Sequence, residues 1–134
     1  DQAAKKANLT SKDYITKTLK RKEVPTYLAA MDIGFMLRQN ELLNIVASPT
    51  KFAEYLISGA PVITTPYVGD YSAMVSSHKL GFVSEDLTYS KSLSQFISDV
   101  KAQRENYRVE CIRYSTQQLT WDAVENDYKM ALPK

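Results

Sequence analysis

Cysteine and histidine are almost missing from this sequence, which has one of each among 134 residues, Cys111 and His78. A single cysteine cannot form a disulfide within the chain, and these two residues cannot supply the roughly three to four ligands of a zinc site. We therefore expect a reducing compartment and no bound metal. We expect Cys111 to be a small core residue rather than a nucleophile, and His78 to be a surface residue at a helix end.

A strong excess of one charge is missing as well, because 17 Lys and Arg residues stand against 15 Asp and Glu residues, for a net charge of +2. No stripe of basic residues is interleaved with stacking aromatics, so we expect no nucleic-acid partner. No apolar run approaches the roughly 20 residues that span a bilayer, and residues 1–13 resemble neither a signal peptide nor a transit peptide. We expect a cytoplasmic protein whose contact with a membrane, if any, is peripheral and at its inner face.

The charge is nevertheless uneven along the chain. Residues 1–22 contain seven Lys and Arg residues but only two acidic ones, Asp1 and Asp13. Such a run is usually a solvated surface, and the alternative is a basic patch that meets anionic lipid.

Apolar runs alternate with helical patterns between residues 24 and 83. The runs 32–37 and 61–65 are apolar or β-branched and predict buried parallel strands, and residues 81–83 predict a last short strand. Helices are expected near residues 24–31, where Pro25 takes the first position, near 48–58 and near 71–77. Residues 38–47 are expected to form a loop.

The C-terminal third has only helical patterns. Three stripes, each expected to face inward, are Leu93, Phe96, Ile97 and Val100, then Tyr107, Cys111 and Tyr114, then Trp121, Val124, Tyr128 and Leu132. Thr120 is suited to cap the last helix. The sequence therefore predicts one α/β domain over residues 1–134, a partial doubly wound (Rossmann-like) parallel sheet with a helical C-terminal third. Ligands of such sheets bind at the carboxyl ends of the strands.

The segment from Ser48 to Glu54 is the stronger candidate for a binding site. Ser48 is placed to cap a helix that has Pro49 at its first position, and the first turn of a helix offers unpaired N–H groups and partial positive charge to a phosphate. Lys51 adds a mobile cation there. Glu54 lies one turn past Thr50 on the same face, where a carboxylate can accept hydrogen bonds from sugar hydroxyls.

A purely structural interpretation of this segment stays open. In it, Ser48 and Pro49 are only good capping residues, and Lys51 and Glu54 form an exposed ion pair. The core face of the helix would then consist of Phe52, Ala53 and Leu56.

A second candidate is the loop 65–71, which follows a predicted strand. Gly69 gives the backbone freedom there and Asp70 is suited to cap the next helix, so a turn and a cap explain most of this loop. Arg38, at the end of the preceding strand, is placed to face an anionic ligand or to be solvated.

Two segments carry a resemblance to a known family. VPTYLAAMDIGFML, residues 24–37, and SPTKFAEYLISGAPVITTPYVGDY, residues 48–71, resemble bacterial glycosyltransferases of the GT-B fold, of the group 1 family that assembles capsule and lipopolysaccharide. The resemblance implies a retaining transferase, in which a nucleoside diphosphate sugar is the donor and a glycan or lipid-linked molecule the acceptor, without a further cofactor. By position, Glu54 would hold the donor ribose, and Ser48, Thr50 and Lys51 would lie beside the diphosphate.

The sequence departs from this family in two respects. Many members have a glutamate where this chain has Val46, so the residue that contacts the transferred sugar is not identified. Nothing here matches the glycine loop, the Arg and Lys that neutralise the leaving diphosphate, or the acceptor domain, so the catalytic residues stay unknown. We expect an incomplete C-terminal donor-binding domain that is inactive alone. The alternative from another class is a non-catalytic, flavodoxin-like binding module in which Ser48 and Glu54 are structural.

The resemblance also has a consequence for the sheet. Residues 14–17 resemble the third strand of the doubly wound order but would lack the strand beside them. Residues 32–37 would then form an exposed apolar edge. Because such edges pair with other chains, we expect either a homodimer through this edge or a displaced N-terminal segment.

Overall fold

Three short parallel strands form the sheet of this protein in the computed structural model, which describes residues 2–85 and 90–131, without the side chains of 126–128 and 131. The strands are β1 (Gly34–Met36), β2 (Val62–Thr64) and β3 (Gly81–Val83), in the order β1-β2-β3. Phe35 pairs with Ile63, and Ile63 pairs with Phe82. The predicted α/β class with a partial doubly wound parallel sheet is confirmed.

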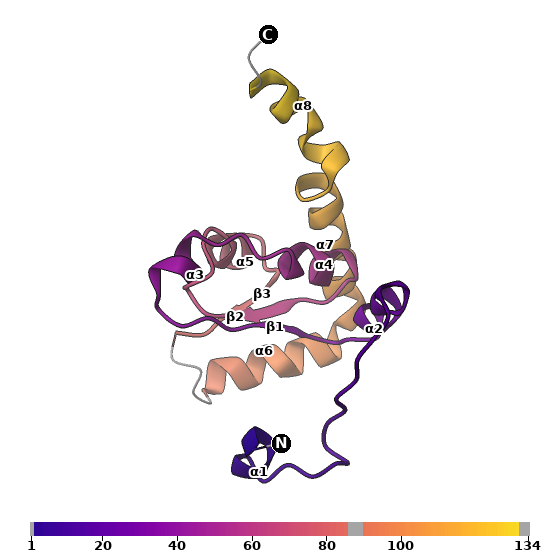
Figure 1. Ribbon diagram of the computed structural model, residues 1–134, viewed down its shortest axis with the longest axis vertical. Helices are drawn as coiled ribbons and strands as arrows, with labels where there is room; N and C mark the ends of the chain where they lie inside the picture. The colour runs from indigo at the N-terminus through magenta and orange to yellow at the C-terminus, as the bar shows by residue number, and fades with distance from the viewer. Residues whose placement is uncertain (1, 86–89, 132–134) are drawn as a thin grey trace.

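Helices cover both faces of the sheet and extend beyond it. Figure 1 shows α4 and α5 on one face, α6 on the other, and α7 followed by α8 projecting away from the sheet. No helix among the described residues is both long and apolar enough to cross a bilayer. The helices are α1 (Gln2–Lys6), the 3-10 helix η1 (Arg21–Glu23), α2 (Val24–Ala29), α3 (Leu42–Val46), α4 (Lys51–Ile57), α5 (Tyr71–Ser77), α6 (Lys91–Ala102), α7 (Arg104–Gln118) and α8 (Trp121–Ala131).

The core has two parts, one on each face of the sheet. On the face covered by α4 and α5, the buried residues include Phe52 and Leu56 of α4 and Cys111 of α7. On the face covered by α6, the buried cluster consists of Ile63 of β2 with Phe96 and Val100 of α6. β2 is thus buried from both sides, which is typical of a strand inside a parallel sheet.

Two glycines are required by the local backbone. A Cβ on Gly81 would lie 1.8 Å from the carbonyl oxygen of Val62, so no side chain fits where β3 meets β2. Gly59 has a φ of 83° directly after α4, where its N–H donates to the carbonyl of Leu56. This left-handed residue ends the helix at the predicted place.

The segment 38–47, expected as a loop, contains the short helix α3. The N–H groups of Asn44 and Ile45 both donate to the carbonyl of Glu41, which starts this helix. Its apolar side chains face solvent, and Leu42 is 76% exposed. Leu42, Ile45 and Val46 have the i, i+3, i+4 spacing of a helix, but α3 has only five residues, which is too few for this pattern to separate a helix from a loop.

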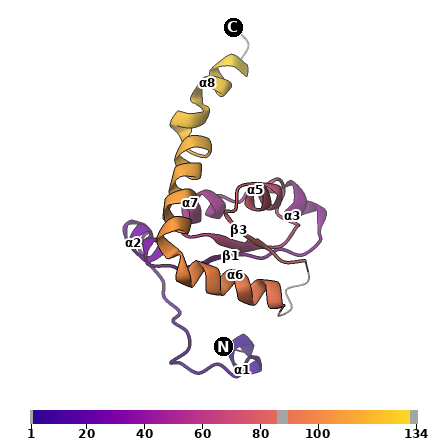
Figure 2. The same cartoon turned by 180° about the vertical axis from the view of Figure 1, so that it is seen from behind.

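The N-terminal segment does not form the strand expected at residues 14–17. These residues are irregular, and Ile15 is 89% exposed. In both views the segment runs from α2 toward the α6 side of the sheet, and α1 lies beyond α6 (Figures 1 and 2). A strand without a neighbour to pair with has no partner for its backbone groups, so these residues have nothing to hold them extended.

Some residues of the predicted buried run 32–37 and of the helical stripes do not face inward as expected. Phe35 is 59% exposed in the centre of β1, and Ile97 of α6 is also exposed. Trp121 is 62% exposed because α8 projects beyond the sheet. Thr120 does cap α8 as predicted, since its hydroxyl accepts from the N–H of Ala123 at 3.4 Å. The stripe residues Tyr128, by its side chain, and Leu132 lie outside the described residues.

The fold predicts a large difference between two neighbouring residues of α4. Leu56 is fully buried and Ile57 is about half exposed. Leu56→Ala leaves a cavity beside β2, so it is expected to lower the free energy of unfolding by about 2–5 kcal/mol, whereas Ile57→Ala should cost less than about 1 kcal/mol. Urea denaturation followed by circular dichroism measures both. Equal losses in the two variants would contradict the packing of α4 described above.

Candidate functional site

The segments that leave β1 and β2 are tied together at the carboxyl ends of these strands. The hydroxyl of Thr65 accepts from the N–H of Arg38 at 2.9 Å and donates to the carbonyl of Arg38 at 2.7 Å. One residue earlier, the hydroxyl of Thr64 donates to the carbonyl of Met36 at 2.9 Å. Thr64, the last residue of β2, and Thr65 directly after it therefore fix the course of the chain after β1, and with it the place where a ligand of this sheet is expected.

A cavity of about 440 Å³ lies beside these segments, and we call it the Ser48 cavity. It is lined by the end of α3, the residues before α4, the start of α5 and the end of α7. Its volume falls within the range of small-molecule sites. The lining residues are Ile45, Val46, Ala47, Ser48, Gly69, Asp70, Tyr71, Met74 and Leu119.

Ser48 does not cap α4, in contrast to the prediction. The helix begins at Lys51 after Thr50, two residues later than expected, and no side chain caps it. The hydroxyl of Ser48 is instead hydrogen-bonded to the phenol of Tyr71, with 2.6 Å between the oxygens. The ring of Tyr71 packs on Phe52, with ring centroids 4.4 Å apart. Ser48 is therefore held by a residue 23 positions away rather than by its own helix.

The structure brings the two sequence candidates together in this cavity. Gly69 has a φ of 63°, a left-handed conformation that favours glycine, and it lines the cavity with Asp70, Tyr71 and Ser48. Asp70 does not cap α5 by its side chain as expected, but its carbonyl accepts from the N–H of Met74 at 3.1 Å. The carboxylate of Asp70 is thus not used by the start of α5.

Glu54 does not face this cavity. It is exposed and lines a separate cavity of about 300 Å³ between α4 and the segment of α2, together with Arg21, Val24 and Pro25, among others. Phe52 and Leu56 point into the core, and Glu54 is about 200° around the helix axis from each of them. Glu54 must therefore point away from the sheet.

Along the chain, Thr50 and Lys51 lie between Ser48, which lines the Ser48 cavity, and Glu54, which lines the cavity beside α2. Both are exposed, and Lys51 is the first residue of α4. The exposed ion pair between Lys51 and Glu54, which the structural interpretation expected, is not formed in the described part of the chain. The four predicted site residues therefore form a continuous strip of chain, of which only Ser48 lines the Ser48 cavity.

Sequence reasoning missed the apolar part of the cavity wall. Ile45 and Val46 come from α3, which was expected to be a loop. Leu119 comes from the end of α7, far along the chain from the rest of the wall, which ends at Met74. Met74 was expected only as a residue of its helix. One signal in the sequence could have indicated α3, namely its four apolar residues within a polar stretch.

Cys111 is confirmed as a core residue. It is fully buried, and burial raises the pKa of its thiol from 9.0 to about 12, with a smaller contribution from the charge of Glu110. Because the thiolate is the nucleophilic form, a thiol with this pKa is unreactive near neutral pH. His78 is exposed at the end of α5 as expected, and its ring packs on that of Tyr114 at 4.6 Å.

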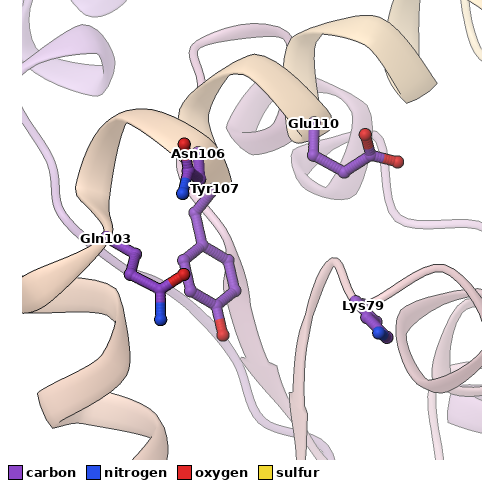
Figure 3. Close-up of a pocket in the computed structure, with 5 residues that line it drawn as sticks. All are labelled: Lys79, Gln103, Asn106, Tyr107 and Glu110. Atoms are coloured by element: carbon purple, nitrogen blue, oxygen red, sulfur yellow. The ribbon is translucent and has the colours of Figure 1, made fainter.

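Another cavity, of about 210 Å³, lies near the opposite ends of the strands. Figure 3 shows its lining, which is Lys79 from the turn before β3 and Gln103, Asn106, Tyr107 and Glu110 from the region where α7 begins. Burial raises the pKa of Tyr107, and the charge of Asp99 adds to this effect. This position is at the amino ends of the strands, where ligands of open parallel sheets are not expected.

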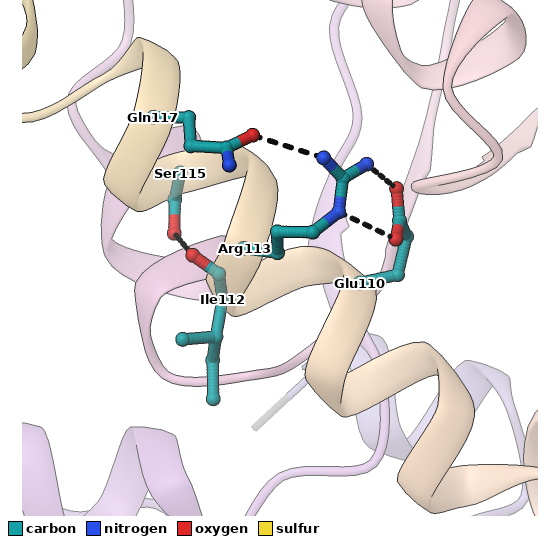
Figure 4. A network of polar contacts seen from close by, with 5 residues as sticks. All are labelled: Glu110, Ile112, Arg113, Ser115 and Gln117. Atoms are coloured by element: carbon teal, nitrogen blue, oxygen red, sulfur yellow. Dashed lines mark hydrogen bonds and ion pairs between the residues drawn. The ribbon is translucent and has the colours of Figure 1, made fainter.

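The charge of Glu110 is balanced within α7 itself. Its carboxylate pairs with the guanidinium of Arg113, and Arg113 also donates to the side chain of Gln117 at 2.9 Å (Figure 4). The hydrogen bond from Arg113 lowers the pKa of Glu110. The carboxylate of Glu110 in the wall of this cavity is therefore already paired by a residue one turn away.

Within residues 2–85 and 90–131, no three side chains of His, Cys, Asp or Glu are grouped so that they could hold a metal ion. Comparison with models of protein families gives no match, and comparison with curated proteins gives none either.

The hydrogen bond between Ser48 and Tyr71 is predicted to contribute to stability. In a double-mutant cycle, Ser48→Ala and Tyr71→Phe should show a coupling energy of about 0.5–1.5 kcal/mol, because each change alone removes the same bond. The free energies of unfolding of the four proteins give this value. Ser76→Ala combined with Tyr71→Phe is the control and should be additive, since Ser76 bonds to Ser72. A cycle in which Ser48 and Tyr71 are equally additive would refute the bond.

Proposed function

We propose that this chain is the donor-binding part of a glycosyltransferase that uses a nucleoside diphosphate sugar and retains the anomeric configuration. The acceptor would be a glycan or a lipid-linked molecule. The observation that carries the proposal is the position of the Ser48 cavity, where the segments leaving two parallel strands meet. This is the place at which open α/β sheets bind their ligands.

The diphosphate would lie at the mouth of the Ser48 cavity. The hydroxyl of Ser48 is a donor for phosphate oxygens, and the exposed side chain of Lys51, three residues later, supplies a cation. Arg38 is exposed at the end of β1 and supplies another. Asp70, which lines the cavity, is negatively charged like the diphosphate and repels it, so these two cations are needed to offset this repulsion.

The nucleoside would extend along α4 from the Ser48 cavity. In this arrangement the diphosphate passes the exposed Thr50 and Lys51, and Glu54 accepts hydrogen bonds from the ribose hydroxyls. Glu54 faces the cavity beside α2, so the ribose and base would lie on the α2 side of α4. Ser48 and Glu54, which line different cavities, would then bind different parts of one extended donor.

The proposal concerns binding and not turnover by this chain alone. Transfer of a sugar requires cationic groups that neutralise the departing diphosphate and an acceptor held against the donor. Affinity for the donor is expected to be modest, because Lys51 and Arg38 are exposed and their attraction for phosphate is weakened by solvent. The alternative, a non-catalytic flavodoxin-like module, expects no affinity for nucleotides at these residues.

Titration with a panel of nucleoside diphosphates tests the proposal. With ¹⁵N-labelled protein, the amide signals of residues 48–54 and 69–71 are expected to shift, since they line the path of the donor. Lys51→Gln should weaken binding by roughly threefold to tenfold through loss of one charge-assisted contact. The matched control is Lys12→Gln, which removes another exposed lysine, from the N-terminal segment, and should leave the affinity unchanged.

Two results of this titration would contradict the proposal. In the first, no nucleoside diphosphate shifts the amides of residues 48–54. In the second, shifts are confined to the cavity at the start of α7, around Tyr107 and Glu110.

A further inference from the structure

The side chains that line the Ser48 cavity are mainly apolar. They come from three parts of the chain that are far apart in the sequence. The apolar residues of the wall are Ile45, Val46 and Ala47 from α3 and its end, Met74 of α5, and Leu119 directly after α7. We call this set the apolar wall. A diphosphate at the mouth of the cavity leaves this wall to the group that the diphosphate carries.

The backbone sets the position of the apolar wall. A Cβ on Gly69 would lie 3.0 Å from the carbonyl oxygen of Ile45 and 3.2 Å from that of Ala47. The end of α3 therefore packs directly on the turn before α5, and both views show α3 beside α5 (Figures 1 and 2). The wall thus exists before a ligand binds, which lowers the cost of binding.

The two hydroxyl groups of the cavity have little left to donate to a sugar. Ser48 and Tyr71 are hydrogen-bonded to each other, with 2.6 Å between their oxygens. Each hydroxyl has one hydrogen, so when Tyr71 donates to Ser48, only the hydrogen of Ser48 is free. In the proposed complex the diphosphate accepts that hydrogen. No hydroxyl hydrogen of this pair then remains for the sugar.

Asp70 is the other polar side chain of the cavity. Within the described part of the chain, its carboxylate neither caps α5 nor takes part in an ion pair. An ionised carboxylate only accepts hydrogen bonds, so its partner must be a donor such as a sugar hydroxyl. The side chains of the cavity therefore offer the sugar one strong acceptor and an apolar wall.

We infer that the sugar of the donor is a 6-deoxyhexose, whose ring hydroxyls donate to Asp70 and whose methyl group contacts the apolar wall. This inference rests on the proposed function, because it requires the diphosphate at Ser48. The methyl group projects from the ring and buries apolar surface against Val46 and Met74. A 6-hydroxyl at the same place would lose its water without gaining a partner among these side chains.

Other common sugar substituents fit these side chains less well. The carboxylate of a uronic acid would be repelled by Asp70. The N–H of an acetamido group is able to donate to Asp70, but its carbonyl oxygen needs a donor, and the hydrogen of Ser48 is already used by the diphosphate. A methyl group needs neither a donor nor an acceptor.

Sugar nucleotides that differ in a single oxygen test this inference. Glucose is compared with 6-deoxyglucose, and mannose with 6-deoxymannose, each attached to uridine, thymidine or guanosine diphosphate, with the bare nucleoside diphosphates as references. On the nucleotide that binds, a 6-deoxy sugar is expected to bind roughly threefold to tenfold more tightly than its parent hexose in calorimetry. Nuclear Overhauser effects are expected between its methyl group and the methyl groups of Val46 and Met74.

A matched pair of valine variants assigns this preference to the wall. Val46→Thr keeps the shape of the side chain but adds a hydroxyl to the wall, and Val46 is 70% exposed, so the fold should be retained. The preference for the 6-deoxy sugar should fall to less than about twofold. Val109→Thr makes the same change at an exposed valine of α7 that does not line the Ser48 cavity, and it should keep the full preference.

Asp70→Ala gives a second, independent signature. Bare nucleoside diphosphates should bind at least as tightly as to the wild type, because the repulsion by Asp70 is removed. The extra affinity that the sugar adds over the bare nucleotide should fall by at least about threefold, because its hydroxyls lose their acceptor. A variant that fails to fold would lose both affinities, so misfolding cannot produce this pattern.

The outcomes separate this inference from the proposed function. If no nucleoside diphosphate binds, the proposed function is wrong and the inference is wrong with it. If nucleoside diphosphates shift the amides of residues 48–54 but each parent hexose binds as tightly as its 6-deoxy partner, only the inference is overturned. A preference that Val46→Thr leaves intact, or that Val109→Thr reduces equally, would also overturn it.

Discussion

The burial of β2 is the constraint on which the rest of this structure depends. Its three residues pair with β1 on one edge and β3 on the other, and helices cover both of its faces. Its backbone groups have no access to water, so the neighbouring strands must satisfy them, and the missing side chain of Gly81 lets β3 approach closely enough. The same arrangement brings the carboxyl ends of β1 and β2 together, where Thr65 bonds to Arg38. It also leaves β1 with one edge that nothing in the described chain covers.

Much of this fold follows from short apolar runs and their boundaries. The bounds of α5 and β3 are as predicted, because Gly81 and the loop around Gly69 mark clear limits in the sequence. α3 was not predicted, because a helix of five residues is too short for its apolar spacing to separate it from a loop. Residues 14–17 have the composition of a strand but no neighbouring strand, and pairing, rather than composition, decides whether a strand forms.

The site was predictable in its parts but not in its assembly. Ser48 has the residue type of a helix cap, yet its hydroxyl is hydrogen-bonded to Tyr71. Local sequence patterns do not indicate such a competing partner, because it lies 23 residues away. The direction of Glu54 follows from the burial of Phe52 and Leu56, which turns the opposite side of α4 outward. The sequence placed Glu54 one turn past Thr50 and along the same pocket as Ser48, whereas Glu54 lines a separate cavity beside α2.

The central claim is that the carboxyl ends of β1 and β2 hold the diphosphate of a nucleotide-bound sugar. Photocrosslinking with a nucleoside diphosphate sugar that carries a reactive group on its sugar, followed by mass spectrometry of the labelled peptides, tests it most directly. The account predicts labels within residues 38–54 and 65–74, which surround the Ser48 cavity, and their loss on competition with the unlabelled nucleoside diphosphate. Labels that concentrate on residues 103–110, at the other ends of the strands, or labelling that the competitor does not reduce, would contradict it.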